Sequence, residues 1–163
     1  MDENIGLKAR LTTMCEILFR GKRTDNGEWV EGFYSAEEYN LNSRKIEHIP
    51  HIQVIGKCVS LGVIPQTVGQ YTGLTDKNGR KIFEGDIVRL TDEHNEMEWT
   101  AVVVFGNPNG DYNWGWQLNA IEEFDGNKDI LLWVDMEESG AYCEIIGNIY
   151  DNPELMKGGN NNG

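Results

Sequence analysis

The stretch GQYTGLTDKNGRKIFEGDIVRL, residues 69–90, carries the densest turn and strand information in the chain. Asp76 can accept hydrogen bonds from the local backbone and Asn78-Gly79 tolerates positive φ, so residues 75–79 predict a tight hairpin turn. Strand-forming residues lie on both sides of Gly85, and a glycine inside a strand pattern predicts a bulge or a sharp bend. Short, strongly bent strands are what a small closed barrel needs.

Strand and turn signals continue on both sides of this stretch. Residues 16–22 and 28–34 read as two strands around the turn at 23–27, and the apolar run at 99–105 predicts a buried strand. Residues 35–44 are polar and predict a loop or a short helix, before two short extended pieces at 45–49 and 52–55. With 19 glycines and 10% aromatic residues, the composition favours many short strands over helices. We therefore expect a mainly β protein.

Three blocks of the chain stand out as a set. They are FRGK at residues 19–22, YTGLTDKNG at 71–79 continuing into FEGDIV at 83–88, and EIIGNIYDNPEL at 144–155. Together they resemble the YopX family of phage and prophage proteins. The blocks lie in the order of the family and span most of the chain. The resemblance implies a phage or prophage origin and a C-terminal barrel of SH3 type, but no biochemical role, because none is established for the family.

These features predict three parts. Residues 1–68 form an N-terminal β-hairpin region with a flexible start, residues 69–155 an SH3-like barrel domain, and residues 156–163 a disordered tail of glycine and asparagine. The boundary is placed near Val68 because the densest of the three blocks begins there.

The net charge of −13 is unevenly distributed. Residues 91–163 contain 15 acidic and 2 basic residues, whereas residues 1–90 contain 12 of each. A surface of that sign repels phosphate backbones and disfavours nucleic-acid binding. Apolar runs reach only five residues, far below the ~20 of a membrane-spanning helix, and no signal peptide is evident. Three widely separated cysteines (Cys15, Cys58 and Cys143) suit a reducing cytoplasm, so we expect a cytoplasmic protein with no membrane partner.

Few residues suggest catalysis or metal binding. His48 and His51 have H-x-x-H spacing, but Ile49-Pro50 argues against a helix that would present both to one metal. Glu84 and Asp86 lie in the densest block, where an aspartate beside Gly85 is explained as a turn cap. No nucleophile elbow, phosphate loop or dinucleotide fingerprint is present. We expect no catalytic residue, no cofactor and no metal, and keep an enzyme resting on the histidines or on the carboxylates around Glu84 as a minor alternative.

Tyr112, Trp114 and Trp116 alternate onto one side of a predicted strand and are the candidate binding residues. If exposed, they form a ledge for a peptide or for stacked bases; if buried, they belong to the core, which is the interpretation that large aromatics favour.

Two classes of function follow. The first is a non-catalytic module that binds a protein partner with a basic surface and can self-associate. The second is a nucleic-acid-binding small barrel, with a variant in which the acidic half imitates DNA and occupies a host DNA-binding protein. The basic residues available to it are Arg20, Lys22, Arg23, Lys77, Arg80, Lys81 and Arg89.

Overall fold

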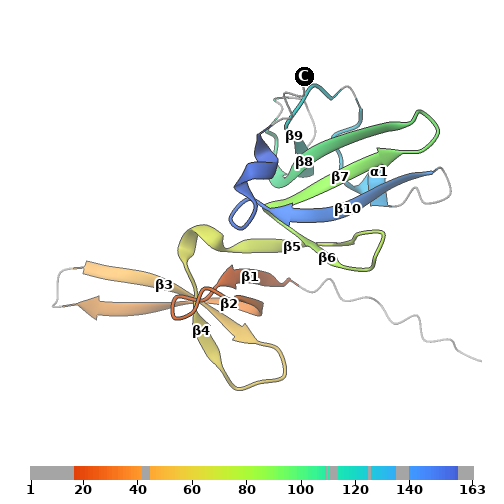
Figure 1. Ribbon diagram of the computed structural model, residues 1–163. Coiled ribbons are helices and arrows are strands. Elements are labelled where there is room, and N and C mark those ends of the chain that lie inside the picture. The colour runs from red at the N-terminus through yellow and green to blue at the C-terminus, as the bar shows by residue number, and fades with distance from the viewer. Residues whose placement is uncertain are drawn as a thin grey trace, which may run out of the picture.

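The computed structural model describes residues 17–41, 45–108, 110, 114–124, 126–134 and 140–157, with the side chains of residues 37–48 left out. These residues form two antiparallel sheets (Figure 1). The first sheet has six strands in the order β4-β3-β2-β1-β5-β6. Their bounds are Phe19–Lys22 (β1), Trp29–Leu41 (β2), Lys45–Val54 (β3), Ser60–Gly62 (β4), Gly69–Thr75 (β5) and Lys81–Phe83 (β6).

The second sheet has four strands in the order β10-β7-β8-β9, which are Asp86–Asp92 (β7), Met97–Gly106 (β8), Gly115–Ala120 (β9) and Ala141–Asn148 (β10). One α-helical turn, Leu131–Val134 (α1), and short 3₁₀ helices at Pro65–Thr67 and Pro153–Met156 complete the described elements. No described helix has the length and apolar character needed to span a bilayer. The prediction of a mainly β protein is confirmed. A closed SH3-like barrel is not, because neither sheet closes on itself among the described strands.

The turn predicted at residues 75–79 is present, and Asp76 holds it together. Its Oδ1 atom accepts the backbone N–H groups of Asn78 and Arg80, both at 2.9 Å, and Gly79 has the expected positive φ of 76°. The Oδ2 atom accepts the N–H of Ile145 in β10 at 3.1 Å, so the buried carboxylate also ties the turn to the second sheet. The second predicted break is present too, since Gly85 (φ 81°) turns the chain from β6 into β7.

The N-terminal hairpin is confirmed, but its second strand is longer than predicted. β1 pairs with β2 from Phe19↔Gly32 to Lys22↔Trp29. β2 then continues through the segment predicted as a loop or short helix and pairs with β3 as far as Leu41↔Lys45. The prediction for residues 35–41 was wrong because cross-strand pairing satisfies the backbone hydrogen bonds of a polar segment as well as those of an apolar one.

The main hydrophobic core lies on one face of the second sheet. Val88, Leu90, Ala101, Val103 and Leu118 from the strands are buried, and the segment that holds α1 covers them with Phe124, Ile130 and Trp133. Trp99 contacts this cover through ring contacts with Phe124 and Trp133. The strand predicted at residues 99–105 therefore supplies core residues as expected, apart from Phe105, whose side chain is 61% exposed.

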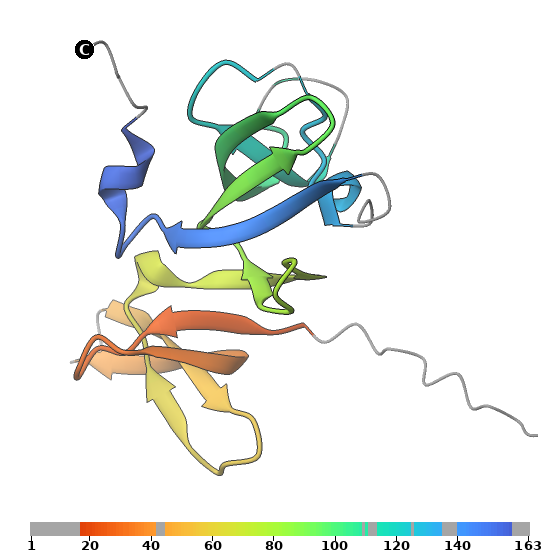
Figure 2. The same ribbon diagram turned by 45° about the vertical axis from the view of Figure 1, so that its right-hand side comes forward.

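The two sheets meet along β5 and β6, which lie between β1 and the second sheet (Figure 2). β5 pairs with β1 through Phe19↔Gln70 and Arg20↔Gly69, so the first sheet includes strands from both sides of Val68. The division of the chain into domains at that residue stays a prediction.

Candidate functional site

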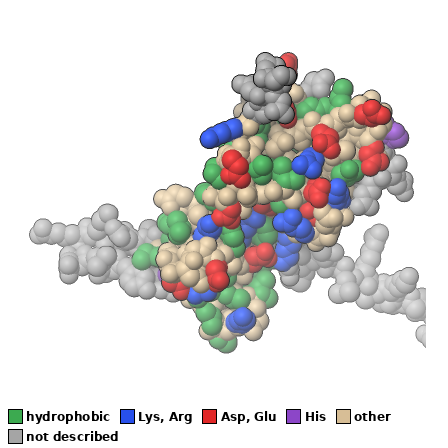
Figure 3. All heavy atoms as spheres, in the orientation of Figure 1, with side chains coloured by type: hydrophobic (Ala, Val, Ile, Leu, Met, Phe, Trp, Pro, Cys, Tyr) green, Lys and Arg blue, Asp and Glu red, His purple; other side chains and the backbone are tan. Residues whose placement is uncertain are grey.

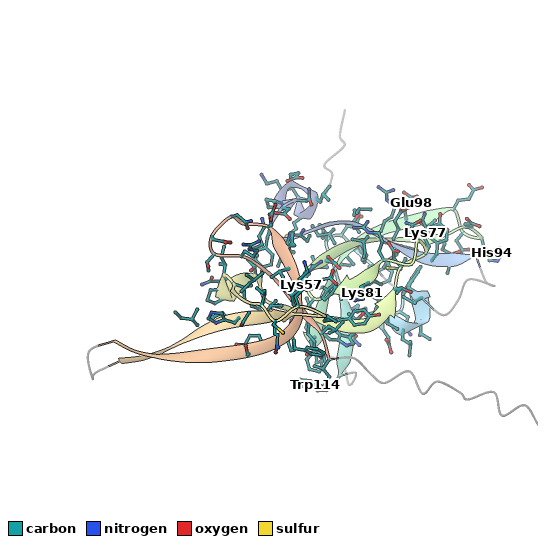
Figure 4. The ribbon with its side chains drawn as sticks, turned by 90° about the horizontal axis from the view of Figure 1, so that it is seen from below. Lys57, Lys77, Lys81, His94, Glu98 and Trp114 are labelled. Carbon is teal, nitrogen blue, oxygen red and sulfur yellow. The ribbon has the colours of Figure 1, made fainter. Side chains whose placement is uncertain are left out.

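Two of the three predicted aromatic residues, Trp114 and Trp116, lie at the end of the β8–β9 hairpin. Trp114, immediately before β9, is 77% exposed, so the expectation that it belongs to the core was wrong. Trp116 is partly buried and packs against the core, and its ring also contacts that of Phe105 edge to face, with 5.0 Å between the centroids. Tyr112 lies outside the described residues. Figure 4 shows Trp114 at the periphery of the molecule.

Position along the strand, and not the face of the sheet, explains why Phe105 is exposed. Phe105 and Trp116 are opposite each other in the register and share the face of the sheet that carries Ala101, Val103 and Leu118. That face is covered near the middle of β8 and β9 but not at the hairpin end, where Phe105 is largely exposed. We call Phe105, Trp114 and Trp116 the aromatic end.

The aromatic end can bury apolar area but has no group that titrates near neutral pH. Large aromatic side chains bury about 150–250 Å² each when covered, and they dominate the energetics of protein interfaces. Sequence reasoning missed Phe105, which it assigned to a buried strand. The signal that could have identified its position is Gly106 directly after it, because this glycine, with a φ of 119°, is the last residue of β8 and places Phe105 at the end of the strand.

A polar cluster, separate from the aromatic end, lies where the two sheets meet. Arg20 Nη2 is 2.6 Å from Asp86 Oδ1, and the side chains of this pair are 13% and 1% exposed. Asp86 Oδ2 accepts the N–H of Phe83 at 2.8 Å, which confirms its interpretation as a turn cap, and Arg20 also donates to the carbonyl of Glu84 at 3.3 Å. Burial raises the pKa of Asp86, and the positive charge of Arg20 opposes part of that rise.

The guanidinium of Arg20 also lies over two aromatic rings. Its Cζ atom is 4.8 Å from the ring centroid of Trp29 and 4.9 Å from that of Phe83. A planar guanidinium can stack on aromatic faces while it keeps a carboxylate partner, which a lysine does less well. Arg20 therefore joins β1, β2 and the β6–β7 turn in one contact network.

Asp151 forms a third contact at the junction, from beyond the end of β10. It pairs with Lys22 and accepts hydrogen bonds from Trp29 Nε1 at 2.6 Å and Asn148 Nδ2 at 3.0 Å. The hydrogen bond from Asn148, followed by those from Lys22 and Trp29, lowers the pKa of Asp151 to about 2. Next to it, the Tyr150 hydroxyl donates to the carbonyl of Gln66, and its ring lies 6.1 Å from that of Trp29.

Ion pairing accounts for most of the basic residues considered for nucleic-acid binding. Besides Arg20 and Lys22, four more of the seven have a carboxylate partner. These pairs are Arg23–Asp25 at 2.5 Å, Lys77–Glu144 at 2.8 Å, Lys81–Glu31 at 3.5 Å and Arg89–Glu98 at 4.0 Å. Arg80 donates to the carbonyl of Ile145 at 3.0 Å. Arg20, Arg80 and Lys81 line a cleft of about 310 Å³ at the junction together with the carboxylates of Glu31 and Asp86, so its positive charge is largely balanced.

The residues considered for metal binding or catalysis do not converge. His48 and His51 both lie in β3, so the backbone forms a strand here and not the helix that H-x-x-H spacing would need, and the side chain of His48 lies outside the described part of the structure. His51 Nδ1 lies 2.9 Å from the carbonyl oxygen of Ile49. Across the described part of the chain, no three histidine, cysteine or carboxylate side chains are grouped as metal ligands would be. Cys143 is buried, which raises the pKa of its thiol to about 12; Cys58 is exposed, and Cys15 lies outside the described residues.

The sequence of this chain matches a known protein family. The family model described as "YopX protein" matches residues 18–157, which is most of the chain. The chain belongs to the YopX family.

Two further comparisons add little. No curated protein matches the YopX chain. Among solved structures, the crystal structure of protein EF1440 from Enterococcus faecalis is similar, with 22% identity, a TM-score of 0.41, and coverage of 86% of this chain and 98% of that one.

The three YopX-like blocks of the sequence meet at the junction between the sheets. Arg20 and Lys22 belong to the first block, Asp86 to the second and Asp151 to the third, and they form the ion pairs Arg20–Asp86 and Lys22–Asp151. The second and third blocks are also joined by the backbone, because Ile149 donates to the carbonyl of Gly85 at 3.0 Å. These residues thus hold the two sheets together, and the aromatic end is a separate surface.

Proposed function

We propose that this YopX-family protein is a phage- or prophage-encoded, non-catalytic interaction module that binds a protein partner in the host cytoplasm. The observation that carries this proposal is the exposure of Trp114 (77%) beside Phe105 (61%) at one end of the second sheet. Aromatic side chains that cluster on a surface are typical anchors of protein interfaces. The aromatic end is the surface that we assign to the partner.

Charge specifies the chemistry of that partner. Residues 91–163, which form most of the second sheet and its connections, contain 15 acidic and 2 basic residues. Carboxylates are spread over this lobe in the space-filling view (Figure 3). The partner we propose therefore has an apolar pocket for Trp114 surrounded by lysine and arginine, because opposite charges steer association and like charges oppose it.

A host DNA-binding protein with a basic DNA site is one partner of this kind. In that case the acidic lobe of the YopX-family protein would compete with DNA for the site. The test is whether the protein displaces a labelled DNA duplex from the captured partner, and a partner that binds DNA and this protein at the same time would exclude competition.

The ion pairs weigh against the nucleic-acid alternative. Six of the seven basic residues that would contact phosphates already have a carboxylate partner within 4.0 Å. Each would have to leave that carboxylate before it could neutralise a phosphate. We expect no electrophoretic shift of single- or double-stranded DNA at about 50 mM salt, where phosphate contacts are strongest. A shift whose affinity falls steeply with salt would favour the alternative.

A non-catalytic role is consistent with the state of the candidate reactive groups. The buried Cys143 thiol has its pKa raised to about 12, so it is not an activated nucleophile at neutral pH. Asp86 is occupied by Arg20 and by the N–H of Phe83. Both groups have structural partners that a reaction would have to displace.

The test is affinity capture of the tagged protein from host lysate, with nuclease added, followed by mass spectrometry. The wild type is compared with Trp114→Ala and with Met97→Ala, a control at the other end of β8 whose side chain is 50% exposed. We expect a specific partner with the wild type and the control, and recovery reduced at least about tenfold with Trp114→Ala, as for an interface anchor.

Two results would contradict the proposal. One is equal recovery of the partner by Trp114→Ala and the wild type, which would place the interface elsewhere. The other is turnover of a substrate by the purified protein with no specific partner recovered. Raising the salt concentration tests the charge component, because recovery is expected to fall as the steering charges are screened.

A further inference from the structure

The β2–β3 hairpin extends well beyond the strands that flank it. β2 and β3 pair without interruption from Gly32↔Val54 to Leu41↔Lys45. β1 pairs with β2 only as far as Gly32, and β4 pairs with β3 only at residues 51–53. Residues 33–41 and 45–50 therefore form a two-stranded arm, which projects from the body of the protein in Figures 1 and 4.

The arm differs from every other sheet margin that the structure describes. The outer edge of β9 is covered by residues 128–130, with Leu118 donating to the carbonyl of Lys128 at 2.7 Å. The outer edge of β10 is covered by the 75–80 turn, where Lys77 donates to the carbonyl of Cys143 at 3.0 Å. The edge strands β4 and β6 have three residues each. Proteins usually shorten or cover their edges in this way, and a two-stranded hairpin alone is marginally stable in water.

The hydrogen-bond pattern shows which backbone groups of β2 face outward. Val54 donates to the carbonyl of Val59, and the carbonyl of Pro50 accepts from Val63, so both residues direct their backbone groups away from β2. Their register partners are Gly32 and Ala36. Each of these is a non-hydrogen-bonded pair of the antiparallel ladder, in which the backbone N–H and C=O groups of both residues point away from the partner strand. Such pairs recur at every second residue along the two strands. The N–H and C=O groups of Tyr34, Ala36, Glu38 and Asn40 therefore face the outer edge of β2.

The opposite edge of the arm is less suited to pairing. Pro50 in β3 has no N–H group to donate, and its carbonyl is already taken by Val63 at 2.9 Å. β2 has no proline between Phe33 and Leu41. A partner strand would find a continuous ladder of donors and acceptors on β2 but an interrupted one on β3.

We infer that the outer edge of β2 pairs with the same edge of a second copy of the chain, antiparallel about a two-fold axis. Identical edges satisfy each other in that arrangement, because each contributes the same alternation of donors and acceptors. The two arms then form one four-stranded sheet. No other contact between the two copies is required.

Charge and exposure favour a second copy at this place. Residues 33–50 contain three acidic and two basic residues, whereas residues 91–163 contain 15 and 2, so two copies that approach through their arms meet less repulsion than two that approach through their acidic lobes. At the base of the arm, Phe33 and Tyr34 are 49% and 46% exposed. Their rings supply apolar surface at the margin of the sheet that would form.

The test uses the full chain and a pair of variants at one position. Ala36→Pro removes an outward N–H without removing a bond to β3, and Ala36→Gly changes the same side chain but keeps the N–H. Molar mass is measured by light scattering at protein concentrations up to about 1 mM. We expect the wild type and Ala36→Gly to reach the mass of a dimer and Ala36→Pro to stay monomeric. Circular dichroism and the amide exchange of β7 and β8 check that the second sheet is intact in each variant.

Hydrogen exchange of the outward amides identifies the occupant of the edge. We expect the amides of Tyr34 and Ala36 to become at least about tenfold more protected as the protein concentration rises through the dimerisation range. A monomer at every concentration with rapidly exchanging amides at 34 and 36 overturns the inference. So does protection that is independent of concentration and is lost on deletion of residues 1–16, because the chain itself would then cover the edge. A dimer that Ala36→Pro does not weaken also overturns it.

Discussion

The two sheets are stabilised in different ways. Among the described residues, the second sheet has a core of eleven buried residues, ten from its own strands and the α1 segment and one, Ile82, from β6. Among the side chains that the structure describes, the part of the first sheet formed by β1 to β4 and the residues beside them buries fewer large apolar ones, such as Leu18, Ile52 and Val63, and it continues into the arm. Apolar burial thus dominates in one lobe and backbone pairing in the other, with a charged junction between them.

This difference determines how each region should respond to change. Removing a core side chain should affect the second sheet, and breaking the ion pairs should affect the attachment of the first sheet to it. Substitutions of exposed groups should have small effects in either region.

Breaking the junction should have the largest effect. Asp86→Ala leaves the guanidinium of Arg20 buried without its carboxylate and frees the N–H of Phe83, and we expect a loss of about 3–5 kcal/mol in the free energy of unfolding. Urea denaturation followed by tryptophan fluorescence measures it. The matched control is Glu84→Ala in the same turn, whose backbone carbonyl makes the contact with Arg20 and remains in the variant. Equal losses in the two variants would contradict the role of the ion pair.

Opening the core of the second sheet should have a similar or slightly smaller effect. Leu118 is completely buried among the strands and the α1 segment, so Leu118→Ala should cost about 2–5 kcal/mol through lost burial and a residual cavity. Asn119→Ala, the exposed neighbour in β9, should change stability by less than about 0.5 kcal/mol. If amide exchange in β1 and β2 accelerates as much as exchange in β8, the two sheets unfold as one unit and the contrast between them fails.

Acid should weaken the junction contact of Asp151. Its pKa in the folded protein is lowered to about 2, below the value of about 3.9 for an unfolded aspartate. A lowered pKa means that the contribution is complete above the unfolded value and is lost as the pH falls through the folded value. The stability difference between the wild type and Asp151→Asn should therefore shrink from about pH 4 to about pH 2. A difference that stays constant over that range would show that the charge of Asp151 is not what stabilises the contact.

The smallest effect is expected for a surface ion pair in the second sheet. Arg89 and Glu98 are 4.0 Å apart and both side chains are well exposed, so Arg89→Gln should change the free energy of unfolding by less than about 0.5 kcal/mol. Thermal denaturation at low and high salt measures this. A larger, salt-sensitive loss would mean that charge contributes to the second sheet as much as to the junction.

Local signals in the sequence predicted local structure well. The turn held by Asp76, the break at Gly85 and the β1–β2 hairpin are all present, because a few neighbouring residues determine each of them. The extension of β2 was missed, because pairing with β3 rather than its own polar residues makes it a strand.

The candidate surfaces depend on contacts that the sequence does not display. Alternation placed Trp114 and Trp116 on the same side of a strand. Whether that side is buried depends on how far the cover formed by Phe124, Ile130 and Trp133 extends over the sheet. Arg20 and Asp86 are 66 positions apart, and their pairing follows from the arrangement of strands that separate them. Exposure and ion pairing are therefore properties of the fold, whereas turns are properties of short segments.

The strand order of the second sheet also has a consequence for synthesis of the chain. β7 pairs with β10, which begins 49 residues after β7 ends. At about 5–20 residues per second, a ribosome needs a few seconds to make the intervening segment. During that time the first sheet already has all its strands, while one side of β7 waits for its neighbour. The nascent protein is therefore most exposed to mispairing and to chaperones while the segment between β7 and β10 is being made, in the lobe that becomes its best-packed part.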